Sequence, residues 1–326
     1  MAVGPSVPAM PELGPITLGT AAFGSPAHAA WNIDENAACR LVSRAVDLGI
    51  TSFDTGSSYG AGLAEQYLGS ALARLGRRHE ITVATKIFFP SNPGAGDGGL
   101  SRRNLIATLD RSLARLRTDY VDLLMIHRFD PLVPIDETLR TLDALVRSGR
   151  VRFLGASSMS AWRLMKMLAH QRGHALAPFV AMQGHYNLLY REEEREMLPL
   201  TVEEGLIYAA WSPLARGRLA GAAGDRARLA EDRRAVERFD ATLDTPVLGA
   251  LDALSTQTGF PHAQLALAWL IRQGVVAVLG ASCPEELSVA LAARETAMAI
   301  DFGAVEAAYR PHGVIGFDPK DETFGA

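Results

Sequence analysis

Residues 120–157 read YVDLLMIHRFDPLVPIDETLRTLDALVRSGRVRFLGAS, and the fold prediction starts from the pattern in this stretch. An apolar run ends at His127, a segment with helical spacing of its apolar residues covers 135–149, and a second apolar run covers 151–157. The stretch therefore predicts a strand, a helix and a second strand, which together make one βα unit of a parallel sheet.

The same alternation continues along the chain almost to its end. Strand candidates lie at residues 16–19, 51–55, 81–86, 120–127, 151–157, 179–183, 206–212 and 275–282. Helix candidates lie at 35–49, 63–75, 102–116, 135–149, 161–172, 192–205, 246–259 and 284–294. A doubly wound open sheet alternates in the same way, but eight strands is the number in a (β/α)8 barrel. We predict one α/β domain over residues 1–326, a (β/α)8 TIM barrel.

Three segments interrupt this alternation. Residues 88–101 are rich in Gly and Pro and follow the third strand, so they are predicted to form a mobile loop. Residues 213–245 follow the seventh strand and are densely charged, which indicates an insertion over the same face of the barrel. The tail after Ala297 is predicted to be a final loop that reaches back toward that face.

The composition is that of a globular protein without a strong net charge. The 326 residues are 48% hydrophobic, and 32 Lys and Arg against 36 Asp and Glu give a net charge of -4. This balance lacks the positive field that nucleic acids and anionic membranes attract, so neither is expected as a partner. Cys39 and Cys283 are the only cysteines, which predicts free thiols in a reducing cytoplasm. Neither a signal peptide nor a membrane anchor is expected.

Four ionisable residues lie at the ends of consecutive predicted strands. Asp54 ends the second strand, Tyr59 follows it in the loop GSSYG, Lys86 ends the third strand and His127 ends the fourth. In barrel enzymes the C-terminal strand ends carry the active site, so these side chains are expected to converge. Each residue alone has a structural explanation as a cap, turn or rim residue, but the set predicts a catalytic site.

These four residue types have separable roles in carbonyl and alcohol chemistry. Tyr59 is the candidate proton donor, although the ordinary pKa of tyrosine, near 10, is high for this role at neutral pH. The ammonium of Lys86 is expected to lower the pKa of Tyr59 by about 1–3 units, and Asp54 is expected to keep Lys86 charged. His127 is expected to hydrogen-bond the substrate oxygen and to fix its orientation.

The remaining strand ends carry amide, hydroxyl and aromatic groups. They are Ser157 and Ser158 on the fifth strand, Gln183 on the sixth, Trp211 and Ser212 on the seventh, and Gly280 and Ser282 on the eighth. Such groups suit the flat, amide-bearing ring of a nicotinamide, and the small-residue turn before a helix at Pro284 suits a phosphate. The alternative is that Gln183 and the serines satisfy turn backbones while Trp211 packs in the core.

Other nucleotide and metal motifs are missing from the sequence. No GxGxxG follows a strand and no GxxxxGK[ST] occurs, so a Rossmann or P-loop site is not predicted. The eight histidines are scattered without a metal-ligand spacing, and no metal site is predicted.

With these residues identified, the sequence resembles the aldo-keto reductases over essentially its whole length. The resemblance rests on LGTAAFG (18–24), GITSFDTGSSYGAGLAEQYLGSAL (49–72), ATK (84–86), DYVDLLMIHRFDP (119–131), ETLRTLDALVRSGRVRFLGASSMSAW (137–162), MQGHYNLLYREEEREMLP (182–199), AWSPLARGRL (210–219) and VLGAS (278–282). GASSMSAW and HYNLLYREEE are most similar to a bacterial branch of the family.

The resemblance implies a barrel with NADPH extended over its C-terminal face and the reduction of an aldehyde or ketone to an alcohol by hydride transfer. It implies that Tyr59 donates the proton, that Asp54 and Lys86 adjust the pKa of Tyr59, and that His127 positions the carbonyl. It implies that the coenzyme is bound by Gly19, Thr20, Asp54, Ser157, Ser158, Gln183, Trp211, Ser212, Pro213, Leu214, Gly217, Arg218, Gly280, Ser282 and Glu286.

Several positions depart from the pattern of similar sequences. Cys283 stands where a basic residue is common, Glu286 and Ala290 stand where a glutamine and an asparagine are usual, and Gly184 replaces an asparagine that is often seen. Ala21 and Ala22 stand where a bulkier residue is frequent. The loss of a cation and the gain of Glu286 weaken the expected site for the 2′-phosphate of NADPH, which makes NADH the alternative coenzyme unless Arg218 or another loop arginine replaces the cation.

The leading prediction is a cytoplasmic, NADP-dependent carbonyl reductase or alcohol dehydrogenase that acts on a small molecule. The alternative, from a different class, is a coenzyme-binding redox sensor that resembles potassium-channel β-subunits. The physiological substrate, the reaction direction and the oligomeric state are left open by the sequence, because they depend on loops whose conformation no pattern fixes.

Overall fold

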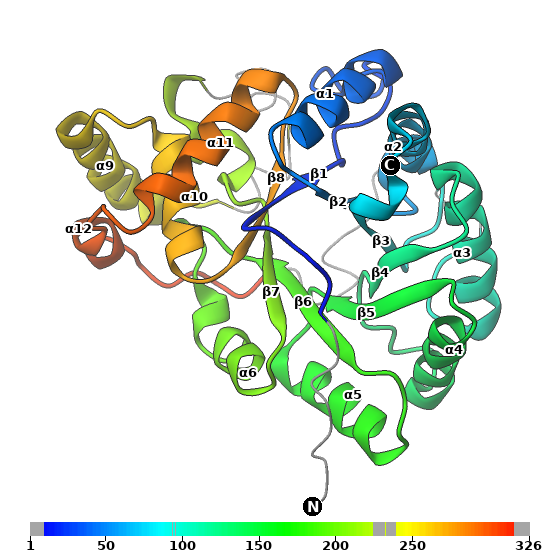
Figure 1. The fold of residues 1–326 in the computed structure, drawn as a ribbon. Coiled ribbons are helices and arrows are strands. Elements are labelled where there is room, and N and C mark those ends of the chain that lie inside the picture. The colour runs from blue at the N-terminus through cyan, green and yellow to red at the C-terminus, as the bar shows by residue number, and fades with distance from the viewer. Residues whose placement is uncertain (1–9, 93, 95, 224–231, 233–238, 316–326) are drawn as a thin grey trace, which may run out of the picture.

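The strands form a closed, all-parallel barrel. In the computed structural model, which describes residues 10–92, 94, 96–223, 232 and 239–315, the strands pair in chain order and the last closes on the first. Figure 1 looks along this barrel, with helices around the ring of strands. The strands are β1 (Ile16–Gly19), β2 (Ser52–Asp54), β3 (Thr82–Ile87), β4 (Val121–Ile126), β5 (Val151–Ser157), β6 (Phe179–His185), β7 (Ile207–Trp211) and β8 (Val276–Gly280).

All eight predicted strands are present, which confirms the (β/α)8 barrel. Their bounds differ from the prediction by up to two residues, since β6 continues to His185 and β8 ends at Gly280. Along β4 the side chains alternate between two environments. Leu123 and Met125 belong to a small apolar cluster of strand residues, whereas Leu124 belongs to the large core shared with the helices.

Apolar residues before β1 pack against the clusters formed by the strands. Met10 and Leu13 contact the cluster that contains Leu123 and Met125, and Leu13 also contacts Val276 and its neighbours. Because these residues precede the first strand, they cover the N-terminal ends of the strands. These apolar residues do not cover the C-terminal ends of the strands, where the predicted site residues lie.

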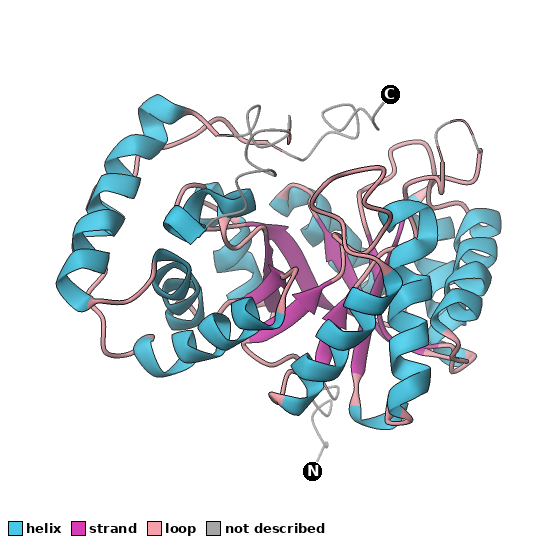
Figure 2. Cartoon of the chain, turned by 90° about the horizontal axis from the view of Figure 1, so that it is seen from above, coloured by secondary structure: helices cyan, strands magenta, loops and turns pink. Residues whose placement is uncertain are grey.

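The helices surround the strands, as the side view in Figure 2 also shows. They are α1 (Glu35–Asp47), α2 (Leu63–Leu75), α3 (Arg102–Leu116), α4 (Ile135–Arg147), α5 (Ala161–Gly173), α6 (Met197–Glu203), α9 (Ala241–Thr258), α10 (His262–Arg272), α11 (Pro284–Thr296) and α12 (Gly303–Ala307), with 3-10 helices η1 (Tyr59–Gly62), η2 (Arg78–Glu80), η3 (Glu192–Glu194) and η4 (Ala215–Ala223). None of the helices among the described residues has the length and apolar character needed to cross a bilayer.

Between β7 and β8 the sequence predicted one helix, at 246–259, and the structure has two. The predicted helix corresponds to α9, which lies at the periphery in Figure 1, while α10 packs between it and the barrel. Every residue from Gln264 to Leu270 is buried. A helix that is buried on all sides has no polar face and therefore no helical period, which is why α10 escaped detection.

The remaining differences concern loops. The helix predicted at 192–205 is split into η3 and α6. Residues 215–223 of the predicted insertion form η4 and residues from 241 onward form α9, while 224–231 and 233–238 lie outside the described residues. The tail contains α12, and its residues 309–315 contact the β6–α6 loop.

Candidate active site

The structure brings the four ionisable candidates together at the C-terminal ends of β2, β3 and β4. Asp54 is the last residue of β2, Lys86 lies one residue before the end of β3, and His127 directly follows β4. Tyr59 is the first residue of η1, in the loop after β2. This loop turns sharply at Gly60, which has a φ of 54° and where an added Cβ would lie 2.9 Å from the carbonyl oxygen of Phe23.

Lys86 is the centre of this group. Its side chain is 0% exposed, and its ammonium forms an ion pair with Oδ1 of Asp54. Lys86 Nζ also donates to the carbonyl oxygen of Thr55 at 3.0 Å and to the hydroxyl of Tyr59 at 3.3 Å. Its three N–H bonds thus have three acceptors, which fixes the ammonium beside the phenol.

Aromatic rings hold Tyr59 and His127 in place. The centroids of the two rings lie 5.7 Å apart with their planes at 75°, and the ring of Phe89 lies 4.7 Å from that of His127. Phe89 belongs to the stretch 88–101, so this part of the predicted mobile loop is packed against the site.

Burial dominates the protonation of Tyr59, so the predicted net lowering of its pKa is wrong. Burial raises the pKa of Tyr59 above its ordinary value, and the positive charge of Lys86 opposes this without overcoming it. Burial also lowers the pKa of Lys86, but the charges of Asp54 and Tyr59 and the hydrogen bonds to both together outweigh burial and leave that pKa raised. The pair at neutral pH is therefore a protonated phenol beside a charged ammonium.

The same environment keeps His127 neutral. Burial, followed by the positive charges of Arg128 and Lys86, holds the pKa of His127 well below its ordinary value of 6.5. A neutral imidazole has one N–H donor and one lone pair, so it is suited to hydrogen-bond an oxygen rather than to supply a positive charge.

These pKa directions predict the pH profile of carbonyl reduction. Tyr59 stays protonated until the pH exceeds about 10, and His127 stays neutral through the range in which an ordinary histidine titrates. We expect kcat/KM for reduction to be level between about pH 6 and pH 9. A steady-state profile with a step near pH 6.5 that His127→Asn removes would contradict this.

The predicted amide, hydroxyl and aromatic groups are connected to the same site. Gln183 Nε2 donates to Oδ2 of Asp54 at 2.9 Å, and the carbonyl oxygen of Gln183 accepts from the backbone N–H of Ser158 at 2.9 Å. The indole N–H of Trp211 donates to Oγ of Ser158 at 3.0 Å, and Ser157 Oγ lies 3.2 Å from the same atom. Sequence reasoning treated these residues as a separate group and missed the link through Asp54.

The last residue of β1 and the residue that follows it lie beside Asp54. Gly19 is in register with Asp54 on one side and with Gly280 on the other. The backbone N–H of Thr20 donates to the carbonyl oxygen of Asp54 at 2.8 Å, and its buried hydroxyl has no hydrogen-bond partner among the described residues.

The loop after β7 has an irregular backbone. Ser212 has a φ of 53° and Gly217 a φ of 103°, with Pro213 and Leu214 between them. Arg218 places its guanidinium carbon 5.5 Å from the ring centroid of Phe239, and its Nε has no hydrogen-bond partner within the described residues. The loop thus offers a cation beside the end of β7.

At the end of β8 an acidic side chain occupies the helix N-terminus. Glu286 Oε2 accepts from the backbone N–H of Ser282 at 2.7 Å and lies 3.3 Å from its hydroxyl. Cys283 is the N-cap of α11 and supplies no positive charge. The groups that would otherwise bind a phosphate are therefore used by a carboxylate.

Two kinds of observation test whether a nicotinamide coenzyme fits here. Thr20 Oγ1, Thr55 Oγ1 and Nδ1 of His127 are buried at neighbouring strand ends without a hydrogen-bond partner in the described part of the chain. A Cβ added to Gly280 would meet no atom within 4 Å, so space remains above β8. Residues at the strand ends fit a polar ring and its linker, while the N-terminus of α11 does not favour an additional phosphate.

One histidine cluster lies on the outer surface. Asp136, His170 and His174 bring ligand atoms within 4.8 Å of one another, which the sequence did not predict because Asp136 comes from another helix. The two imidazole rings are stacked with centroids 4.1 Å apart and planes at 22°, so their in-plane lone pairs do not converge on one ion. Arg140 Nε also lies 2.8 Å from both oxygens of Asp136. The cluster is arranged as an ion-pair network.

Comparisons with known proteins agree with this geometry. A family model described as the aldo/keto reductase family matches residues 15–308. The versiconal hemiacetal acetate reductase of Aspergillus parasiticus is 34% identical over 78% of this chain and 80% of that protein. An aldo-keto reductase of Alternaria alternata is 33% identical over 92% of this chain and 89% of its own length. A putative aryl-alcohol dehydrogenase of Schizosaccharomyces pombe is 34% identical over 87% and 88%. These relatives are fungal, so the comparisons do not support the predicted bacterial branch.

Proposed function

The chain belongs to the aldo/keto reductase family, and on that basis we propose that it reduces an aldehyde or ketone to an alcohol with a nicotinamide coenzyme. The names of its relatives, which include reductases and putative aryl-alcohol dehydrogenases, support carbonyl and alcohol chemistry on a small molecule. They do not favour the alternative of a redox-sensing regulatory protein. We extend the proposal to the whole chain as one catalytic domain.

The observation that carries the proposal is the position of Lys86. Its ammonium is completely buried, paired with Asp54 and 3.3 Å from the hydroxyl of Tyr59. A buried ion pair is costly when it serves stability alone, because both charges lose their hydration. Its placement against a phenol is what proton transfer to a carbonyl oxygen requires.

We assign the four side chains the following roles. The phenol of Tyr59 donates its proton to the carbonyl oxygen as negative charge develops there, and the ammonium of Lys86 stabilises the phenolate that remains. Asp54 keeps Lys86 charged and in position. His127, as a neutral imidazole, orients the same oxygen through a hydrogen bond.

A bound nicotinamide coenzyme supplies the hydride that completes the reduction. We propose that Ser157 and Gln183 hold its carboxamide and that Trp211 packs against its ring. Ser212 to Arg218 would line the pyrophosphate, with Arg218 as the cation. Because Nε2 of Gln183 donates to Asp54, the amide oxygen of Gln183 would accept a hydrogen bond from the N–H group of the carboxamide.

The adenosine end of the site decides between NADPH and NADH. We propose that the acidic N-terminus of α11 weakens the binding of NADPH, because the carboxylate of Glu286 and the 2′-phosphate have the same charge. NADPH remains the family expectation, with NADH as a coenzyme of similar affinity in this chain.

Replacing Glu286 by glutamine tests this assignment. The change removes the charge and keeps the size, so we expect the Kd of NADPH to fall about fivefold while that of NADH changes less than about twofold. Calorimetric titration of both coenzymes measures the two values, with Glu295→Gln, at the other end of α11, as the control. A parallel change in both Kd values would show that Glu286 does not distinguish the coenzymes.

The test of the function itself is steady-state oxidation of NADPH and of NADH against a panel of aryl aldehydes and ketones. Turnover of at least one carbonyl, with the alcohol recovered in equal amount to the coenzyme oxidised, would support the proposal. Coenzyme binding without turnover of any carbonyl would overturn it and would favour a binding role.

A further inference from the structure

Three aromatic rings form a parallel stack at the ends of β6 and β7. His185 and Trp211 are partners in the register of the two strands, and their ring centroids lie 4.2 Å apart with planes at 6°. On the opposite face of His185 lies the ring of Tyr190, with a centroid distance of 4.5 Å and planes at 14°. His185 is therefore the middle ring, and it is 3% exposed.

Hydrogen bonds determine which nitrogen of His185 carries the proton. Oδ1 of Asn187 accepts from the backbone N–H of Leu189 at 2.9 Å, which fixes the orientation of the Asn187 amide. Its Nδ2 then donates to the carbonyl oxygen of Ser212 at 3.0 Å and to Nε2 of His185 at 3.2 Å. Because Nε2 accepts, the ring is neutral and its proton is on Nδ1.

The same amide joins the two strands that carry the stack. Asn187 follows β6, and Ser212 follows β7, so the bond between them ties the strand ends together. Trp211 is held at its edge as well, since its indole N–H donates to Ser158. The plane of the Trp211 ring is thus set by His185 on one face and by Ser158 at the edge.

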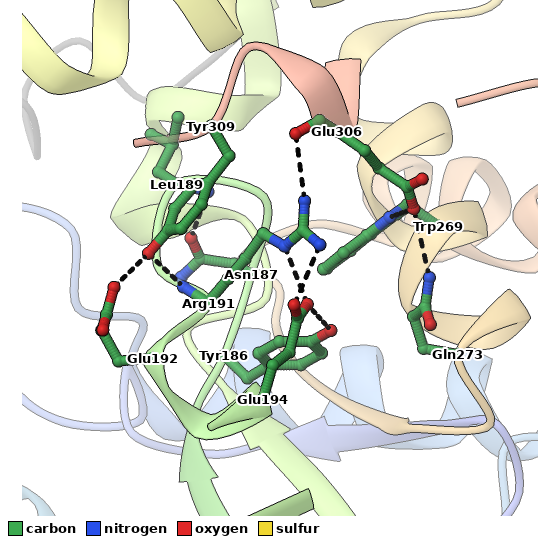
Figure 3. A network of polar contacts seen from close by, with 10 residues as sticks. All are labelled: Tyr186, Asn187, Leu189, Arg191, Glu192, Glu194, Trp269, Gln273, Glu306 and Tyr309. Carbon is green, nitrogen blue, oxygen red and sulfur yellow. Dashed lines mark hydrogen bonds and ion pairs between the residues drawn. The ribbon is translucent and has the colours of Figure 1, made fainter. Parts of the chain in front are cut away.

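The chain's C-terminal segment supports the far end of the stack. The hydroxyl of Tyr190 accepts from the backbone N–H of Ile315 at 3.1 Å. Tyr309 donates from its hydroxyl to Glu192 at 2.7 Å and accepts from the backbone N–H of Arg191 at 2.9 Å. Figure 3 shows the contacts of Tyr309 with Glu192 and Arg191, together with the ion pair of Arg191 and Glu194.

We propose that His185 is a positioning residue for the coenzyme. It fixes the plane of Trp211, against which the nicotinamide ring packs, and Tyr190 supports it from behind with the help of the C-terminal segment. The inference rests on the proposed function, because it assumes that a nicotinamide ring lies on Trp211. It assigns a role to a buried histidine that is outside hydrogen-bond contact with the proposed proton donor.

Two substitutions of His185 separate the ring from its hydrogen bond. His185→Leu removes the flat surface behind Trp211, whereas His185→Phe keeps a flat ring and loses only the bond from Asn187. We expect His185→Leu to raise the Kd of the coenzyme about tenfold and His185→Phe to change it less than about threefold, measured by calorimetric titration without substrate. The KM of the coenzyme should follow the Kd, while the KM of the carbonyl stays within about twofold.

A matched control is His174→Leu, which changes an exposed histidine at the end of α5 and should leave the Kd unchanged. Thermal unfolding of each variant without coenzyme checks that the fold is retained. If His185→Leu does not fold, the pair Tyr190→Leu and Tyr190→Phe decides, with a raised Kd expected only in the leucine variant.

The outcomes are distinct. A folded His185→Leu variant that binds the coenzyme as tightly as the wild type would overturn the inference and leave the proposed function intact. The same holds if His185→Phe and His185→Leu are impaired equally, because the ring would then have no special role. A wild type that binds neither NADPH nor NADH would instead refute the proposed function.

Discussion

Replacement of Tyr59 by phenylalanine should reduce kcat/KM for carbonyl reduction by about 10²- to 10⁴-fold, the usual contribution of a positioned proton donor. The substitution removes only the hydroxyl, which lies 3.3 Å from Lys86 Nζ. Lys86 keeps Asp54 and the carbonyl of Thr55 as partners, so the buried charge stays paired and the fold should be retained. The Kd of the coenzyme should change less than about twofold.

Steady-state kinetics and calorimetric titration of the same preparation measure the two quantities. Tyr67→Phe is a suitable control, because Tyr67 lies on α2 and is packed against the apolar core. Retention of more than about a tenth of wild-type kcat/KM by Tyr59→Phe, together with normal coenzyme binding, would assign proton donation to another group.

A second large effect should come from a buried carboxyl that the proposed mechanism does not use. Glu193, in η3, is 2% exposed, and its Oε2 accepts from the hydroxyl of Tyr208 at 3.1 Å. Its Oε1 has no hydrogen-bond partner within the described residues. Burial, reinforced by the charge of Glu192 and opposed by the Tyr208 hydrogen bond, raises the pKa of Glu193 to about 8.

This raised pKa makes the wild type less stable as the pH increases. The unfolded chain releases the proton of Glu193 near pH 4.5, and the folded chain releases it only near pH 8. Between these values the unfolded state binds fewer protons, so the free energy of unfolding falls with pH. Above about pH 8 the loss is complete and amounts to a few kcal/mol, since one pKa unit corresponds to about 1.4 kcal/mol.

Glu193→Gln should therefore gain stability relative to the wild type as the pH rises. We expect the difference in the free energy of unfolding between variant and wild type to grow by about 2–4 kcal/mol from pH 5 to pH 9. Urea unfolding at both pH values measures it, with the exposed Glu203→Gln as control. A difference that is the same at pH 5 and pH 9 would show that Glu193 titrates normally.

Gly184 stands where similar sequences often have an asparagine, and the contact between Glu193 and Tyr208 explains why a glycine is needed there. A Cβ added at this position would lie 2.1 Å from the hydroxyl oxygen of Tyr208 and 3.0 Å from Oε2 of Glu193. Only glycine leaves room for the phenol to reach the carboxyl. The sequence alone does not show this, because Tyr208 on β7 comes close to Gly184 on β6 only when the two strands pair.

The part of the site that could be predicted from the sequence follows from the position of active sites at the C-terminal ends of barrel strands. Parallel strands in a barrel all direct their C-terminal ends to one face, so knowing where β2, β3 and β4 end was enough to gather Asp54, Lys86 and His127. The hydrogen bond from Gln183 to Asp54 could not be predicted in this way. It joins β6 to β2 across the mouth of the barrel, and the distance between these two strand ends depends on how the barrel closes and on the register of its strands.

The pKa values of the site residues were less predictable from the sequence than the positions of these residues in the barrel. The lysine beside Tyr59 was anticipated, but the sequence does not state how deeply the phenol is buried, and burial proved to be the larger influence on its pKa. The stack of His185 on Trp211 was missed for a related reason. His185 is hydrogen-bonded to Asn187, two residues further along the chain, but its stacking partner Trp211 is brought beside it only by the register of β6 with β7.

Closure of the barrel also has a consequence for biosynthesis. Ile16 of β1 pairs with Ala277 of β8, so β1 has only one of its two neighbours until the ribosome has synthesised the chain as far as β8. During this interval one edge of β1 and one edge of the growing sheet have unpaired backbone groups, a state that favours association with other chains. We therefore expect the yield of folded protein to depend on the supply of chaperones during synthesis.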